Sequence, residues 1–129
     1  MTDPRRTVSL DERSLPAEGR VPPQAVDVEM AVLGAMLLDK GAIAKAIEIL
    51  DDSTFYKPAH QRIFAGMVAL FEKSEPVDLI TLVEELRRRA ELDNVGGEYY
   101  LTELTTRVTT AANVEYHAHI ILEKALMRQ

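Results

Sequence analysis

Three histidines, His60, His117 and His119, are the side chains of this 129-residue chain best suited to proton transfer or metal binding. Two residues apart on a helix, His117 and His119 point about 200° away from each other, so they cannot chelate one ion from one face. No acid–base partner for His60 can be identified along the sequence, and we expect it to pack or form a hydrogen bond beside Phe55. The histidines therefore favour structural roles.

Two pairs of adjacent acids, Asp51–Asp52 and Glu84–Glu85, are the candidates for paired catalytic carboxylates. Neighbours in sequence diverge in space on a turn or a helix, so turn and surface roles are sufficient to explain them. The chain has no cysteine, which excludes disulfides, thiolate nucleophiles and cysteine-based zinc sites. None of the six glycines precedes a lysine, so the phosphate-binding motif G-x-x-x-x-G-K-S/T is missing. We predict no catalytic, metal-binding or cofactor-binding residue in this chain.

Three consecutive arginines, 87–89, suggest a nucleic-acid patch. However, Glu84 and Glu85 lie four residues before Arg88 and Arg89, where exposed ion pairs form, and cations are favoured at a helix C-terminus. The net charge of −6 also disfavours a primary role on a polyanion. We interpret the arginines as a solvated helix end and favour a protein partner.

The composition, with 47% hydrophobic and 28% charged residues, is typical of a globular protein, and the length is that of one domain. The longest apolar runs, such as residues 30–38, are too short to span a bilayer. Residues 1–20 carry as many arginines as acids and few bulky apolar groups, so we expect a flexible tail there. They also lack the layout of a secretory signal, and we expect a cytoplasmic protein.

Apolar residues recur at helical spacing through the rest of the chain, and no strand-like alternation persists, so we predict an all-α fold of about six short helices. Proline, glycine, Asx residues and a Ser/Thr-rich stretch separate the segments. Among these we predict a turn at residues 94–97, because asparagine and glycine accept positive φ angles. The helices are expected at about 24–38, which is apolar nearly all round, at 42–50, from Pro58 onward, after the cap Asp78, at about 98–105, and from Ala111 onward after the cap Thr110.

The last predicted helix carries small and apolar residues at a spacing of three and four, close to a heptad. Because small alanines allow a close helix neighbour, we expect this stripe to be a seam for another helix. No helix stop signal precedes Gln129, so the helix looks severed and the chain looks like a truncated fragment. The seam residues are Val114, Ala118, Ile121 and Ala125.

Short segments in a characteristic order, from residue 21 to the end of the chain, carry a family resemblance. They are Val21-Pro22-Pro23 with Glu29, Val32-Leu33-Gly34 with Leu38-Asp39, Phe55-Tyr56, His60 with Ile63-Phe64, residues 78–82 and 92–97, Tyr100-Leu101, Ala111-Ala112-Asn113 and Glu123-Lys124-Ala125. In these segments the chain resembles the N-terminal domain of the DnaB-type replicative DNA helicases. It departs from many members at Thr109, where they have proline.

The resemblance implies a helical head over residues 21–110, followed by residues 111–129 as the first helix of a truncated hairpin, with the ATPase domain outside this chain. It also implies a hexameric collar, a trimer of dimers, that binds DNA primase and helicase loaders and encircles single-stranded DNA only as an assembled ring. ATP and magnesium would act in the full-length protein, at the replication fork in the cytoplasm.

Two residues are implied as primase contacts by the resemblance, Asp27 and Tyr100. Asp27 also suits the first turn of a helix, where the helix dipole favours a carboxylate. Tyr100 also suits a packed ring with a solvated hydroxyl, although tyrosine is a frequent interface anchor. Both interpretations of each residue stay open at this point.

The sequence as a whole favours a non-enzymatic oligomerisation and primase-docking domain. One alternative is a helix-turn-helix DNA-binding module, which would need a basic recognition helix and would bind duplex DNA in a salt-sensitive way. Another is a small all-α enzyme that uses the acidic pairs, which nucleotide turnover by the purified chain would reveal.

Overall fold

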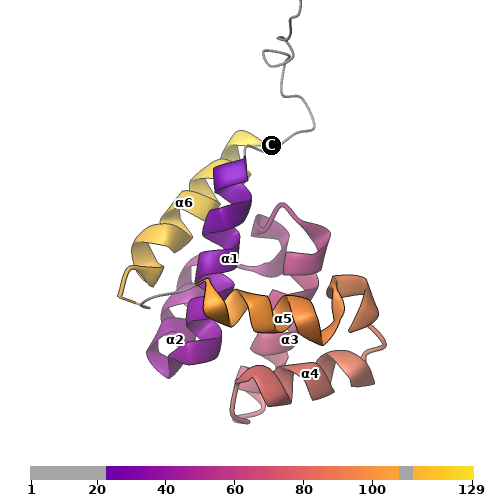
Figure 1. The fold of residues 1–129 in the computed structure, drawn as a ribbon. Helices are drawn as coiled ribbons and strands as arrows, with labels where there is room; N and C mark the ends of the chain where they lie inside the picture. The colour runs from indigo at the N-terminus through magenta and orange to yellow at the C-terminus, as the bar shows by residue number, and fades with distance from the viewer. Residues whose placement is uncertain (1–22, 108–111) are drawn as a thin grey trace, which may run out of the picture.

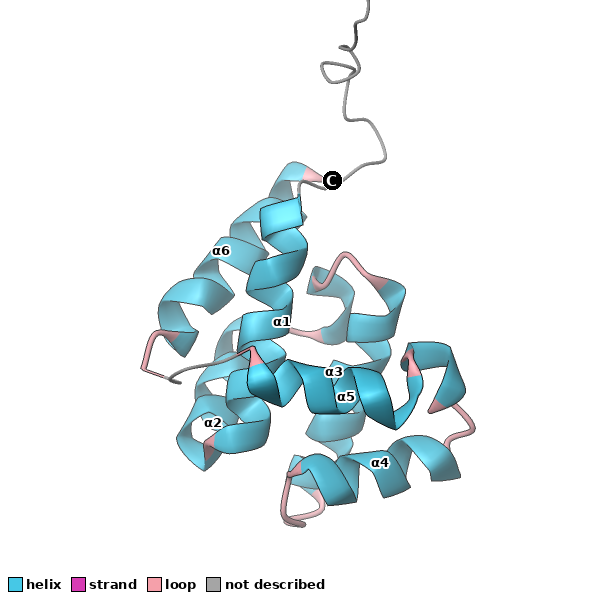
Figure 2. Cartoon of the chain, viewed as in Figure 1, coloured by secondary structure: helices cyan, strands magenta, loops and turns pink. Residues whose placement is uncertain are grey.

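The computed structural model describes residues 23–107 and 112–129, and every regular element within these ranges is helical (Figures 1 and 2). There are six α-helices and two short 3₁₀ turns in the described ranges, which confirms the all-α prediction. They are α1 (Pro23–Leu38), α2 (Lys40–Ile49), η1 (Asp52–Thr54), α3 (Pro58–Glu72), α4 (Leu79–Arg88), η2 (Asp93–Val95), α5 (Gly97–Thr106) and α6 (Val114–Met127). No helix in these ranges combines the length and apolarity needed to cross a bilayer.

Helix α1 is the centre of the molecule. It packs against α2, α3, α5 and α6, as Figure 1 shows. Its residues Val32, Leu33 and Met36 have no exposed surface, in agreement with the expectation for a helix that is apolar nearly all round. Because the other helices are built around α1, residues on its first turns are held in fixed positions relative to α3 and α5.

Side chains at the helix starts set the boundaries. Asp39 accepts a hydrogen bond from the Gly41 amide at 2.9 Å, and this cap starts α2 at Lys40, two residues earlier than predicted. Pro58 stands in the first turn of α3 as predicted. Asp78 caps α4 as predicted. The Thr81 hydroxyl completes a capping box, because it accepts a hydrogen bond from the Asp78 amide at 2.9 Å.

The turn before α5 depends on glycine. Gly96 and Gly97 have φ angles of 109° and 74°, in the left-handed region that the sequence predicted for residues 94–97. A Cβ on Gly96 would lie 2.7 Å from the Cβ of Tyr100, closer than two carbon atoms can approach. The turn therefore fixes the path of α5 and the place of Tyr100 on its first turns.

The last helix begins later than predicted. Helix α6 starts at Val114, with Asn113 as its N-terminal flanking residue and Ala112 in a turn. The expected cap Thr110 and first residue Ala111 lie outside the described residues, as do Thr109, the expected boundary at residue 110 and the expected tail over residues 1–20. The pattern of small residues predicted the helical periodicity of this segment, but it did not predict the residue at which the helix begins.

The stripe on α6 that was predicted as a seam for another helix packs against helices of the chain's own core. Helix α6 packs on α1 and α2, and Val114, Ala118 and Ile121 are buried in the same core as those helices, while Ala125 is half-buried. The physical reason is that a three-four spacing is common to a coiled-coil seam and to any helix that covers a core. Exposed apolar groups of α6 are instead Tyr116, Leu126 and Met127.

Candidate functional site

A chain of polar side chains crosses the interior from α1 through α3 to α5. His60 has no exposed surface, and its Nδ1 lies 2.7 Å from Oε1 of Glu29, while its Nε2 lies 2.6 Å from the hydroxyl oxygen of Tyr100. The predicted contact with Phe55 is confirmed, with the two rings edge to face at 6.5 Å. The sequence-based expectation missed both hydrogen-bond partners, since they are 31 and 40 residues away along the chain.

Glu29 is 3% exposed and accepts hydrogen bonds from the chain segment that leads into α3. Its Oε2 accepts from the amide of Tyr56 at 2.6 Å, and its Oε1 lies 3.5 Å from the amide of Lys57. Backbone amides can only donate, so the oxygens of Glu29 are the acceptors in these contacts. With Glu29 as an acceptor, Nδ1 of His60 carries the ring hydrogen, and in the neutral ring Nε2 accepts from the hydroxyl of Tyr100.

Tyr100 is half-buried, and its surroundings hold both its ring and its hydroxyl. The ring stacks on His60 with centroids 5.9 Å apart and an interplanar angle of 17°, and Nζ of Lys57 lies 4.8 Å from the ring centroid. Burial, and secondarily the negative charge of Glu103, raise the pKa of Tyr100 to about 12, so the hydroxyl keeps its proton at neutral pH. The hydroxyl is directed to His60, a partner that neither of the two sequence-based interpretations of Tyr100 included.

Asp27 lies on the first turns of α1, and its side chain is 59% exposed. Its Oδ1 lies 3.4 Å from Nη1 of Arg107, the residue that follows α5. The positive charge of Arg107 also lowers the pKa of Tyr100, opposing the effect of burial, so this arginine interacts with both predicted contact residues. Because α1 and α5 pack together, the structure brings Asp27 and Tyr100 into one region.

The arginine run at the end of α4 is paired with acids. Arg87 lies 3.1 Å from Glu84 and 2.9 Å from Glu98, and Arg89 lies 3.7 Å from Glu85, the last at the predicted four-residue spacing. Arg88 also pairs with Glu85, at a three-residue spacing. These pairs agree with the interpretation of a neutralised helix end more than with a nucleic-acid patch.

Glu85 is 5% exposed, which corrects the surface role expected for it. Its carboxylate is surrounded by cations, since Nζ of Lys73 lies 3.5 Å away in addition to the two arginines of its own helix. Its neighbour Glu84 is exposed, so the two carboxylates point in different directions. The arrangement is one buried carboxylate with partly exposed cations around it, and it links the C-terminal end of α3 to α4.

The histidines of α6 differ in burial, because His117 is half-buried and His119 is exposed. In residues 23–107 and 112–129, no three side chains of the metal-binding types lie close enough together to hold an ion.

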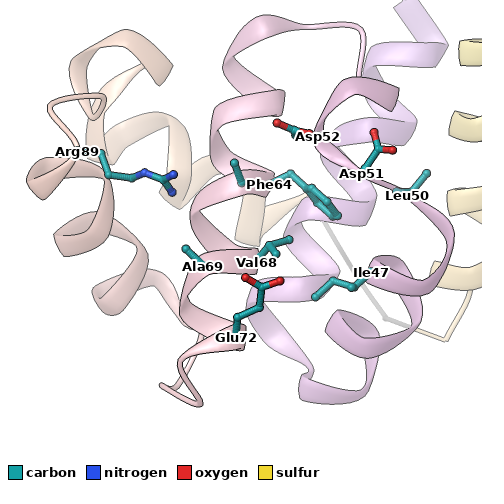
Figure 3. Close-up of a pocket in the computed structure, with 10 residues that line it drawn as sticks. Ile47, Leu50, Asp51, Asp52, Phe64, Val68, Ala69, Glu72 and Arg89 are labelled. Carbon is teal, nitrogen blue, oxygen red and sulfur yellow. The ribbon is translucent and has the colours of Figure 1, made fainter.

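A cavity of about 460 Å³ lies between α2, η1, α3 and α4 (Figure 3). Figure 3 shows Ile47, Phe64 and Val68 between the helices, with the carboxylates of Asp52 and Glu72 at its edges. Among the described residues that line it there is no histidine, serine or threonine. It offers apolar packing with carboxylates and the cation of Arg89 in its lining, and its residues are distinct from the network at Tyr100.

Comparison with protein families decides what kind of domain this is. The family model described as the DnaB-like helicase N-terminal domain matches residues 21–123. The chain belongs to this family. The sequence-based resemblance to the DnaB-type helicases is thereby confirmed, and the helices that carry the network at Tyr100 lie within the matched range.

Relatives of this DnaB-like N-terminal domain are much longer proteins. The chain is 56% identical over 128 residues to the replicative DNA helicase DnaB of Rhodothermus marinus, which covers 99% of the chain and 14% of that protein. It is 48% identical over 110 residues to the replicative DNA helicase DnaB of Geobacillus stearothermophilus, covering 85% of the chain and 24% of that protein. The chain thus spans between one seventh and one quarter of the length of these helicases.

Solved structures of DnaB N-terminal domains share the fold. The domain from Mycobacterium tuberculosis superposes with a TM-score of 0.80 and 46% sequence identity, covering 84% of this chain and 78% of that one. The domain from Helicobacter pylori, described with its interactions with primase, gives a TM-score of 0.70 at 22% identity, covering 81% of each chain. The second likeness concerns the fold alone.

Proposed function

We propose that this DnaB-like domain is the oligomerisation and primase-docking domain of a hexameric replicative DNA helicase. The ATP- and magnesium-dependent unwinding of duplex DNA would be performed by the rest of that protein, in the cytoplasm at the replication fork. The observation that carries the proposal is the 56% identity over nearly the whole chain to a replicative DNA helicase. The Helicobacter pylori domain, whose structure was described with its interactions with primase, supports primase as the partner.

The proposed docking surface consists of Asp27, Lys57, Tyr100 and Arg107. It presents one carboxylate, two cations and a half-buried aromatic ring on neighbouring helices. Tyrosine and arginine are enriched at the energetic centres of protein interfaces, whereas other charged residues belong mainly to the polar rim around them. These residues support the assignment of Asp27 and Tyr100 as primase contacts.

Self-association is proposed for the outer side of α6. Its inner stripe, with Val114, Ala118, Ile121 and Ala125, shapes the helix against α1 and α2. Tyr116, Leu126 and Met127 are 69%, 57% and 76% exposed, so α6 presents large apolar side chains that another subunit could cover. In the assembled ring, this surface would contact other subunits, and a helicase loader would bind in addition. Single-stranded DNA would pass through the ring.

The docking role is tested by calorimetric titration of the chain with its cognate primase. We expect saturable binding that Tyr100→Ala weakens by tenfold or more, as truncating an interface anchor does. The helix-turn-helix alternative is tested in parallel by titrating duplex DNA at two salt concentrations. Salt-sensitive duplex binding together with no binding of primase would reject the proposal.

A further inference from the structure

We propose that Glu29 and His60 are positioning residues for primase docking, which orient the Tyr100 hydroxyl so that it presents an acceptor, and that primase supplies a hydrogen-bond donor to it. The inference rests on the proposed docking function and names the chemistry of the partner at Tyr100. It also gives a role to the buried side chains of Glu29 and His60, which the proposed contacts of Asp27 and Tyr100 with primase do not explain.

With Glu29 as a carboxylate and His60 as a neutral ring, the direction of each hydrogen bond follows from the fixed donors. The amide of Tyr56 can only donate, so Oε2 of Glu29 accepts at 2.6 Å. Oε1 then accepts from Nδ1 of His60 at 2.7 Å, and Nε2 is left with a lone pair toward Tyr100 at 2.6 Å. The Tyr100 hydroxyl has a single hydrogen, and it is used for this bond. What the oxygen offers to any partner is a lone pair.

The ring is fixed on its other sides as well. Lys57 has its amide 3.5 Å from Glu29 and places its ammonium group 4.8 Å from the ring centroid of Tyr100. Gly96 lies against the first atoms of the Tyr100 side chain, because a Cβ there would approach to 2.7 Å. A ring held in this way loses little rotamer freedom on binding, so it makes an efficient anchor.

Glu29→Gln is the variant that tests the hydrogen-bond direction. The glutamine side chain has a single oxygen, which must accept the hydrogen bond from the backbone amide of Tyr56. The side-chain NH₂ group therefore faces Nδ1 of His60. The ring hydrogen then moves to Nε2, which donates to Tyr100, and the tyrosine hydrogen turns outward. In the variant, the hydroxyl of the half-buried Tyr100 offers a partner a donor in place of the acceptor of the wild type, and the side chains keep nearly the same size.

The experiment combines nitrogen NMR of the His60 ring with calorimetric titration of cognate primase. The chains are the wild type, Glu29→Gln, Tyr100→Phe and the double variant. We expect a hydrogen on Nδ1 in the wild type and on Nε2 in Glu29→Gln, and about tenfold weaker primase binding for each single variant. The double variant should bind no more weakly than Tyr100→Phe, since Glu29 acts through the hydroxyl.

Glu85→Gln is the matched control, because Glu85 is also a buried glutamate with several donors but belongs to the α3–α4 ion cluster. It should lower stability and leave primase affinity unchanged. The proposal would be overturned if Glu29→Gln binds primase with wild-type affinity although the His60 ring hydrogen has moved to Nε2. It would also be overturned if the two single-variant losses of primase affinity multiply in the double variant. If the wild type fails to bind primase, the proposed docking function is wrong, and so is the proposal that primase supplies a hydrogen-bond donor. The NMR result then still decides, by itself, how the Tyr100 hydroxyl is oriented.

Discussion

At the residue scale, the central feature is that three polar groups far apart in sequence satisfy one another in the core. Glu29 stands in a helix that is otherwise apolar around it, and His60 has no acid near it in sequence, so each is visible as an exception. Their pairing was not predictable, because it depends on how α1, α3 and α5 pack. A polar residue in an apolar stripe therefore indicates that a buried hydrogen-bond partner exists, but the sequence does not show which residue it is.

Replacing Tyr100 by phenylalanine should destabilise the fold. The change keeps the ring and leaves Nε2 of the buried His60 without its donor, which costs about 1–3 kcal/mol. Urea denaturation measures the free energy of unfolding. The control is Tyr99→Phe, since Tyr99 is 81% exposed and its hydroxyl should contribute within about 0.5 kcal/mol. Equal losses for the two variants would contradict the network.

Alkaline titration should distinguish Tyr100 from the other tyrosines. Its pKa is raised from 10.0 to about 12 by burial, so the folded state keeps a proton that the unfolded state has lost above pH 10. The stability contributed by this group is complete below pH 10 and declines as pH rises toward 12. Phenolate absorbance should show one late-titrating tyrosine that disappears in Tyr100→Phe. A folded wild-type domain whose tyrosines all titrate near pH 10 would be inconsistent with this burial.

At the element scale, boundaries set by capping chemistry were predictable and those set by tertiary packing were not. The Asp78 cap, the Pro58 start and the turn at residues 94–97 follow from local residue types, and the structure has each of them. The start of α6 was predicted too early. The inward direction of its small-residue stripe was also missed, because periodicity shows which residues share a face and not what covers that face.

Gly96→Ala should destabilise the turn that leads into α5. The residue has a φ of 109°, and the added methyl would meet Tyr100 at 2.7 Å, so we expect a loss of about 1–3 kcal/mol. Gly41→Ala is the matched control, since a methyl there would lie at an ordinary 3.4 Å from Asp39 and should be neutral or mildly stabilising. Thermal unfolding of both variants checks this, and a tolerated Gly96→Ala would refute the strained turn.

At the scale of the whole molecule, a single core joins α6 to the remaining helices. The proposed functions then fall on the outer surface, with the proposed docking surface on α1, the start of α3 and both ends of α5, and exposed apolar groups on α6. The family could be predicted from short segments in the right order, whereas this separation of surfaces needed the packing of α6. Primase docking and self-association can on this account be altered independently.

Ala118→Glu tests whether α6 belongs to the core. Ala118 has no exposed surface, so a charge placed there should cost on the order of 3 kcal/mol or more and broaden or lower the unfolding transition. His119→Glu, on the exposed side, is the control and should be stable. If Ala118→Glu unfolds like the wild type and only loses self-association, the stripe is an open subunit seam after all.

The central claim is tested most directly by calorimetric titration of cognate primase into the wild-type chain, Asp27→Lys and Glu48→Lys. The two substitutions change the net charge equally, but Asp27 pairs with Arg107 beside Tyr100, whereas Glu48 lies exposed on α2. We predict wild-type affinity for Glu48→Lys and at least tenfold weaker binding for a correctly folded Asp27→Lys. Equal affinity of all three chains would contradict docking at this surface.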